Sequence, residues 1–335
     1  MKSQPRSSPP KAQPAARARR VSFLQLAVLA QLVVLAGLVV WLATRPPAPQ
    51  PQSQPSIGGV TYCRGLPRFA QAQGFSGQMI FSTSERLMKG LVLYEPNPTP
   101  GASRVYQHPS WDDAGYLGPV VVDRDGDIYV APVPRTNLVD NPPGKQNIIY
   151  RVDRGTGEMA AFLDLPALAP PSPENPFGLL GLAYDCDTHS LYATSVAGST
   201  RSGEVGRIFR IDLNNRAIAA QVENIDAIGV GVLNGAQGKR LYFGAARAPE
   251  VRSIALGEDG NFRGEPRQEF SIATLSGGRD EKARRINFDA GGNMLVYAVE
   301  FNFNLVATSE PPQTVYRLLY RPEQDTFELL DISPD

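Results

Sequence analysis

The chain has 335 residues, with 33 Lys+Arg and 33 Asp+Glu, so its formal net charge is zero. Its length suits one large domain or two ordinary ones. Seven of the basic residues lie at or before Arg45, which leaves 26 basic against 33 acidic residues beyond it; this acidic excess, with no basic stripe, argues against nucleic acid as a partner.

The first 56 residues have the composition of a membrane anchor with its flanks. Residues 1–20, rich in Pro, Ser, Ala and Arg, predict a disordered basic tail. Residues 21–44 contain an uncharged apolar run long enough to cross the lipid bilayer as one transmembrane helix. Because the basic cluster precedes this run, the positive-inside rule predicts a single-pass protein of the cell membrane with a cytoplasmic N-terminus. A cleaved signal peptide is the alternative, but its apolar region would be shorter, about 7–15 residues.

The proline-rich residues 45–56 predict an extended linker, which places residues 57–335 on the extracytoplasmic side. Both cysteines, Cys63 and Cys186, lie in this exported part. An oxidising compartment permits a disulfide between them, which would tie the start of the domain to its middle. Two unpaired thiols are the alternative.

From residue 57 onward the chain repeats loosely about every 50 residues. Each unit has an apolar strand, a tight polar turn and a strand with an aromatic residue, followed by two further strands. The paired strands recur as GFSGQMIFST, VVVDRDGDIYVAP, GLAYDCDTHSLYATS, GVLNGAQGKRLYFGA and INFDAGGNMLVYAVE. Five such units predict an all-β protein, a β-propeller of four-stranded antiparallel blades. Residues 57–74 are expected to add an outer strand or part of a sixth blade, and the C-terminal strand FELLDIS to complete the first blade.

The units PFGLLGLAYDCDTHSLYATS and LGPVVVDRDGDIYVAP resemble the six-bladed TolB-like propellers, including the NHL-repeat and gluconolactonase/strictosidine-synthase-like families. The resemblance implies six blades. For a gluconolactonase-like member it also implies one divalent cation, calcium or another, held in the central channel by Glu, Asn and Asp side chains. Glu300, Asn302 and Asn304 would point to one side of an extended strand and are candidates for part of this set, with Glu85 as a further carboxylate.

Asp123, Asp125 and Asp127 look like the opening of a calcium loop. The equivalent segments of other repeats, DCDTHS, GAQGKR and DAGGN, lack the triple aspartate but share the Gly, Asp or Asn residues of a tight turn. A calcium loop would also need a bidentate Glu at its twelfth position, which is Pro134 here. The sequence therefore favours a turn, with a calcium site as the alternative.

In a propeller, the loops from the second to the third strand and from blade to blade share one face, which is the expected ligand-binding face. Only His108 and His189 are present, which argues against histidine-based zinc chemistry and a Ser-His-Asp triad. The sequence favours a binding or scaffold module for a cell-envelope protein, peptide or glycan, without a cofactor. A metal-dependent lactonase or related hydrolase is the alternative. The residues expected to bind the ligand are Glu85, Arg135, Asn137, Arg247, Arg279, Glu300, Asn302 and Asn304.

Overall fold

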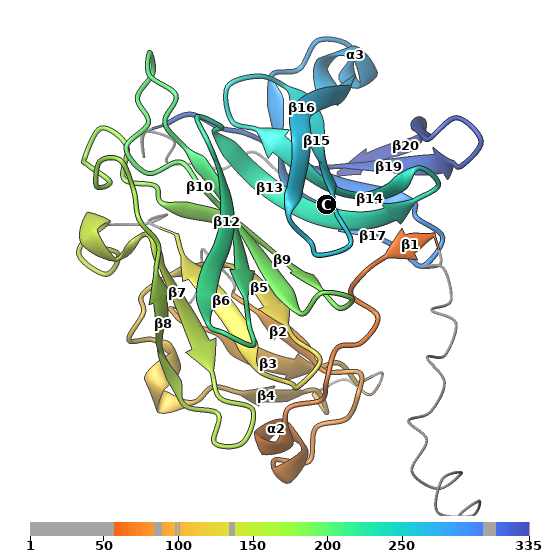
Figure 1. The fold of residues 1–335 in the computed structure, drawn as a ribbon. Coiled ribbons are helices and arrows are strands. Elements are labelled where there is room, and N and C mark those ends of the chain that lie inside the picture. Colours follow the sequence, from red (N-terminus) through yellow and green to blue (C-terminus); the bar gives the residue numbers. More distant parts are fainter. Residues whose placement is uncertain are drawn as a thin grey trace, which may run out of the picture. The chain divides into compact units, whose positions relative to one another are not determined.

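Five antiparallel sheets account for most of the computed structural model (Figure 1), which describes residues 57–83, 89–97, 99, 101–133, 138–303 and 313–334. The expected tail, transmembrane helix and linker, residues 1–20, 21–44 and 45–56, lie outside the described residues. Among the residues that are described, no helix combines the length and the apolar character needed to span a bilayer.

Each sheet is one blade, numbered here in chain order with its innermost strand first. Blade 1 consists of β2 (Ile80–Ser82), β3 (Val92–Glu95) and β4 (Arg104–Tyr106), and blade 2 of β5 (Leu117–Val122), β6 (Ile128–Pro132), β7 (Ile148–Val152) and β8 (Met159–Asp164). Blade 3 consists of β9 (Leu179–Asp185), β10 (Ser190–Ser195), β11 (Arg207–Asp212) and β12 (Ala217–Glu223). Blade 4 consists of β13 (Ala227–Gly235), β14 (Gly238–Ala245), β15 (Glu250–Leu256) and β16 (Phe262–Ser271), and blade 5 of β17 (Glu281–Phe288), β18 (Met294–Glu300), β19 (Thr314–Arg321) and β20 (Thr326–Pro334). The helices are α2 (Arg68–Ala72), η1 (Pro109–Trp111), η2 (Pro143–Lys145) and α3 (Ile272–Ser276).

This arrangement confirms the predicted β-propeller, with one blade for each of the five repeats in the sequence. The sixth blade that the resemblance implied is not found among the described residues. The C-terminal strand does not complete the first blade as expected, because β20 pairs with β19 at the outer edge of blade 5.

The strands differ in burial according to their place in the blade. All seven residues of β9, an innermost strand, are buried, and its sequence LLGLAYD is a nearly continuous apolar run. In β12, an outermost strand, partly buried and exposed residues alternate along AIAAQVE. An inner strand is covered on both faces, whereas an outer strand presents one face to solvent, so its sequence takes a period of two.

Apolar side chains fill the spaces between consecutive blades. Separate clusters join blade 1 to blade 2, blade 2 to blade 3, blade 3 to blade 4, and blade 4 to blade 5. Blades 4 and 5 approach closely at Gly244, where an added Cβ would lie 2.1 Å from the carbonyl oxygen of Ala283. Among the described residues, no such cluster joins blade 5 to blade 1.

Residues 57–67 form an extended segment, here called the strap, that crosses the turns between the first and second strands of successive blades. Its two-residue strand β1 (Gly58–Gly59) pairs with the innermost strand β13, and the Gly59 amide donates to the Asp289 carbonyl of blade 5 at 2.9 Å. The Val60 carbonyl accepts from the Cys186 amide of blade 3, and the Gly65 amide donates to the Asp123 carbonyl of blade 2. Residues 57–74 were expected to form an outer strand or part of a further blade; they instead form this strap and α2 (Figure 1).

The strap is also linked covalently to blade 3, because Cys63 and Cys186 form a disulfide with a Cα–Cα distance of 5.8 Å. The two residues are 123 positions apart in the sequence. A crosslink that closes so long a loop removes many conformations from the unfolded chain.

Replacement of both cysteines by serine is therefore expected to lower the free energy of unfolding by roughly 2–4 kcal/mol. Chemical unfolding can be followed by the fluorescence of Trp111, which is fully buried. Wild-type protein unfolded with a reductant is the control and should match the variant. An unchanged unfolding midpoint would show that the bridge does not stabilise the strap.

Candidate functional site

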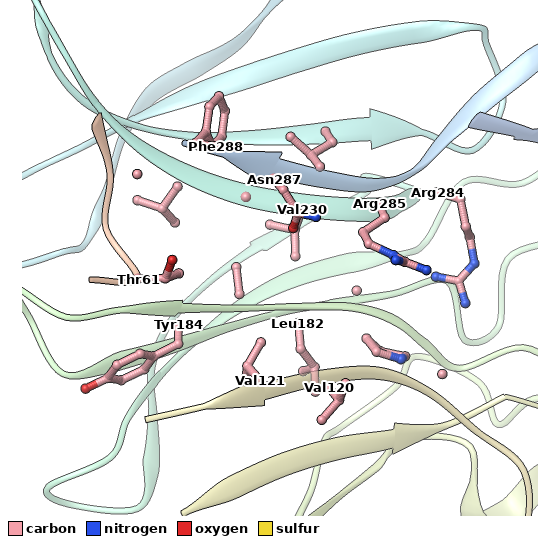
Figure 2. A pocket seen from close by; sticks show the side chains of 18 of the residues that line it. Thr61, Val120, Val121, Leu182, Tyr184, Val230, Arg284, Arg285, Asn287 and Phe288 are labelled. Atoms are coloured by element: carbon pink, nitrogen blue, oxygen red, sulfur yellow. The ribbon is translucent and has the colours of Figure 1, made fainter. Parts of the chain in front are cut away.

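The innermost strands of all five blades surround a central cavity of about 500 Å³ (Figure 2). The strap closes its wall on the side of the first-to-second strand turns, here called the turn face; the opposite side is the loop face. The lining residues are Gly59–Thr61 and Arg64 of the strap, Ile80–Thr83, Gly118–Val121, Leu180–Tyr184, Val230–Val232, Arg284–Phe288 and Gln313.

The cavity is lined by both apolar and polar groups, and its polar side chains carry hydroxyls, amides and guanidinium groups. Three arginines, Arg64, Arg284 and Arg285, line it, and the described lining contains neither Asp nor Glu. The cavity is therefore a positively charged environment as far as the structure describes it. Low-dielectric walls strengthen the electrostatic potential of such groups.

The three arginines are held in different ways. Arg284, on β17, donates from Nη1 to the Leu180 carbonyl of β9 at 2.5 Å and so connects blade 5 to blade 3. The guanidinium of Arg285 lies over the ring of Tyr297, 4.8 Å from its centroid. Arg64 retains surface exposed to solvent, yet the surrounding protein lowers the pKa of its guanidinium by burial, as expected for a group in a cavity.

Aromatic side chains pack near the loop face of the cavity. Phe177, Leu180 and Phe303 belong to one apolar cluster drawn from blades 3, 4 and 5. Phe301 packs on Phe177 and on Phe303, with ring centroids 5.3 and 5.5 Å apart. These residues form an apolar layer on the side where the channel ligands were expected.

This layer changes the interpretation of the segment EFNFN. The period of two was expected to direct Glu300, Asn302 and Asn304 into the channel. The structure instead packs the alternate residues, Phe301 and Phe303, into the cluster and leaves Glu300 and Asn302 exposed, because burial of aromatic surface is the stronger driving force. Neither Glu300 nor Asn302 lines the cavity.

Arg247, expected to bind a ligand, fastens a loop to blade 4. Its Nε donates to Asp226 at 2.6 Å, and its Nη atoms donate to three carbonyl oxygens within residues 200–203. Its guanidinium also lies 5.0 Å from the ring centroid of Phe303. Asp226 is buried, which raises the pKa of its carboxyl, while Ser199 and Arg247 act in the opposite direction. With its donors used in this way, Arg247 has a structural role.

The remaining predicted residues do not form one site in the described structure. Arg279 is largely exposed on the loop face, with Nη1 at 3.8 Å from Glu281 and 3.5 Å from the Thr314 hydroxyl. Glu85, Arg135, Asn137 and Asn304 lie outside the described residues.

The triple-aspartate segment forms a turn. The Asp123 carboxylate accepts hydrogen bonds from the backbone amides of Asp125 and Asp127 at 2.8 and 2.9 Å, which closes the turn from β5 to β6. Asp127 accepts from the amide of Arg154 at 2.8 Å and thereby joins a neighbouring turn of the same blade. Asp123 and Asp127 therefore stabilise the turn by accepting hydrogen bonds from backbone amides, as the sequence favoured.

One potential metal-binding group includes part of this turn. A ligand atom from each of Asp123, Asp125 and His189 lies within 4.8 Å of the others. The Asp125 carboxylate, however, lies 3.3 Å from a guanidinium nitrogen of Arg154, and His189 Nδ1 is within 2.8 Å of the Tyr184 hydroxyl. These side chains already interact with the protein, and two of the three aspartates, not all three, belong to the group.

The charged residues that line the cavity, Arg64, Arg284 and Arg285, are not among those predicted from the sequence. A signal was present in blade 5. Its innermost strand carries the pair Arg284–Arg285 before INFD, whereas the other blades have the uncharged pairs Gly118–Pro119, Leu180–Gly181 and Gly229–Val230 before VVVD, LAYD and GVLN. A charged pair on a strand that should be covered on both faces indicates a polar environment at that position.

Comparison with known proteins finds similarity to solved structures alone. No family model matches the chain, and no curated protein matches it. Among solved structures, the chain is similar to a luciferin-regenerating enzyme (12% identity, 84% of this chain and 78% of that chain, TM-score 0.48). It is also similar to a 6-phosphogluconolactonase-like protein of Bacteroides uniformis (12%, 77% and 82%, 0.42) and to TolB of Acinetobacter baumannii (13%, 78% and 55%, 0.39). These likenesses assign no activity to the chain.

The buried turn aspartate provides a test by pH. Burial raises the pKa of Asp123 from 3.8 to about 6, and the nearby Asp127 adds to this. Because the folded pKa is above the unfolded one, stability should fall as the pH rises from about 4 to about 6. Asp123→Asn keeps an acceptor for the turn amides and removes the titration. The variant should gain up to about 3 kcal/mol relative to wild type across this window, at 1.36 kcal/mol per pKa unit.

Asp153 is the matched control for this measurement. Hydrogen bonds from the Thr156 and Gly155 amides lower the pKa of its carboxyl, so its contribution to stability is lost as the pH falls. Urea unfolding of Asp123→Asn and Asp153→Asn at several pH values should therefore give differences from wild type of opposite pH dependence. Parallel curves for wild type and Asp123→Asn would contradict the role of Asp123.

Proposed function

We propose that this protein is a membrane-tethered, extracytoplasmic β-propeller that acts as a binding or scaffold module for a cell-envelope protein, peptide or glycan. The observation that carries the proposal is the central cavity, which is lined by innermost strands of all five blades and by charged and amide groups. A concave site that combines apolar surface with precisely placed polar groups is the usual form of a ligand-binding site.

The strap shows on which side of the propeller the chain enters the domain. The side chain of Ile57 lies beside Gly292, in the first turn of blade 5, so the preceding linker joins the domain at the turn face. The loop face is on the opposite side of the domain from this attachment.

The alternative, a metal-dependent lactonase or hydrolase, has less support. A hard divalent cation is bound by several oxygen ligands, most of them carboxylates or carbonyls. The described lining of the cavity offers three guanidinium groups and no carboxylate, and Glu300 and Asn302 do not line it. Positive charge in the cavity would oppose the binding of a cation there.

Metal addition discriminates between the two functions. The full chain in detergent should show the same melting temperature in EDTA and with added Ca²⁺, Mg²⁺, Mn²⁺ or Zn²⁺. A ligand that binds only the folded state raises stability by RT ln(1 + [L]/Kd). A clear rise with one of these metals, abolished by EDTA, would favour the hydrolase and call for a lactone assay.

Membrane attachment has its own test. The full chain should remain in the membrane pellet after extraction with alkaline carbonate, and a variant lacking residues 21–44 should be released. Protease added to intact cells should degrade the propeller of the full chain if it lies outside. Release of the full chain by carbonate would contradict the tether.

A further inference from the structure

We propose that the central cavity binds a small organic carboxylate with an apolar body, and that Arg285 holds the carboxylate group. This inference rests on the proposed binding function and specifies the ligand class of the same cavity.

The charge of the lining selects an anion. Arg64 of the strap and Arg285 of β17 line the cavity, and none of the described lining residues is acidic. A cavity lined with one sign of charge raises the local concentration of the opposite ion.

The stacking of Arg285 prepares it for a planar anion. Its guanidinium lies over the ring of Tyr297 at 4.8 Å, which fixes the plane of the group while its N–H donors remain around the edge. The Arg285 side chain is exposed, and no ion pair joins it to a carboxylate among the described residues. A guanidinium held by its face can donate two parallel hydrogen bonds to a carboxylate in its plane.

Asn287 supplies a second polar group near Arg285. It is two positions further along β17, so both side chains project to the same side of the strand. Asn287 is exposed and lines the cavity, and Figure 2 shows it with the neighbouring arginines. Its amide can donate to the same anion or to a polar atom beside it.

The apolar side chains in the cavity lining favour an organic ligand over an inorganic anion. Val120, Val121, Leu182, Val230 and Phe288 contribute apolar surface around the cavity (Figure 2). The cavity volume of about 500 Å³ lies within the range of small-molecule sites, roughly 300–1,000 Å³. A ligand with a carboxylate at one end and an aromatic or aliphatic body would satisfy both parts of the lining.

Phenylacetate is a suitable probe, with phenylethanol, phenylethylamine and inorganic phosphate as matched controls. Binding to the full chain in detergent is measured by calorimetry, and folding of each variant is checked by its melting temperature. Phenylacetate should bind, phenylethanol and phosphate should bind at least tenfold more weakly, and phenylethylamine should not bind.

Variants locate the site. Arg285→Gln should weaken phenylacetate binding roughly tenfold or more, because it removes charge-assisted hydrogen bonds. Arg285→Lys keeps the charge without the planar fork and should be intermediate. Asn287→Leu, which does not disturb the stacked pair, should weaken binding a few-fold. Arg317→Gln, on the exposed surface of blade 5, is the control and should bind as wild type does.

Four outcomes would overturn the inference: no binding of phenylacetate, equal binding of phenylethanol, equal binding of phosphate, or full affinity in folded Arg285→Gln and Asn287→Leu. None of these results would affect membrane attachment or the capture of an envelope partner at the loop face. A melting temperature that depends on added metal would instead overturn the proposed binding function itself, so the two failures can be told apart.

Discussion

The constraint that shapes this propeller is that a row of blades must be joined from its last member back to its first. Apolar clusters connect each blade to the next from blade 1 to blade 5, and the described residues contain none between blade 5 and blade 1. The strap instead links the blades along the turn face, through the pairing of β1 with blade 4 and backbone hydrogen bonds to blades 5, 3 and 2. It then leads into α2, whose Phe69 packs in the core between blades 1 and 2. The strap lies so close to the blade 2 turn that a Cβ on Gly65 would be 2.5 Å from the Arg124 carbonyl oxygen.

The same strap gives the cavity its character. By crossing the turn face it adds Thr61 and Arg64 to a lining otherwise made of inner strands. Two arginines show how context decides the use of one residue type. Arg247 is held by Asp226 and by loop carbonyls, so its charge is used within the fold. Arg285 is held by the face of an aromatic ring, which leaves its edge for other partners.

Local pattern was sufficient to predict the propeller, its five repeats and the turn formed by Asp123, because each depends on residues close together in the sequence. The cavity depended on non-local contacts. Nothing near Arg64 in the sequence indicates that it lies with Arg285 in one lining, since the strap is placed by turns of blades 2, 3 and 5, which are distant in the sequence. In EFNFN, side chains alternate between two sides of the extended chain, and either set could face inward. Packing of Phe301 against Phe177 places the aromatic set inside.

The strap also defines how the domain would respond to mechanical load. Any pull on residue 57 is directed first along β1, whose only ladder is the short pairing of Gly58 and Gly59 with β13. The next firm attachment is the covalent bond at Cys63, which transfers the force to blade 3. Tension would therefore peel residues 57–62 from the turn face while the disulfide shields Arg64 and α2. Residues 59–61, which line the cavity on the turn face, would therefore detach first, while the five blades keep their structure.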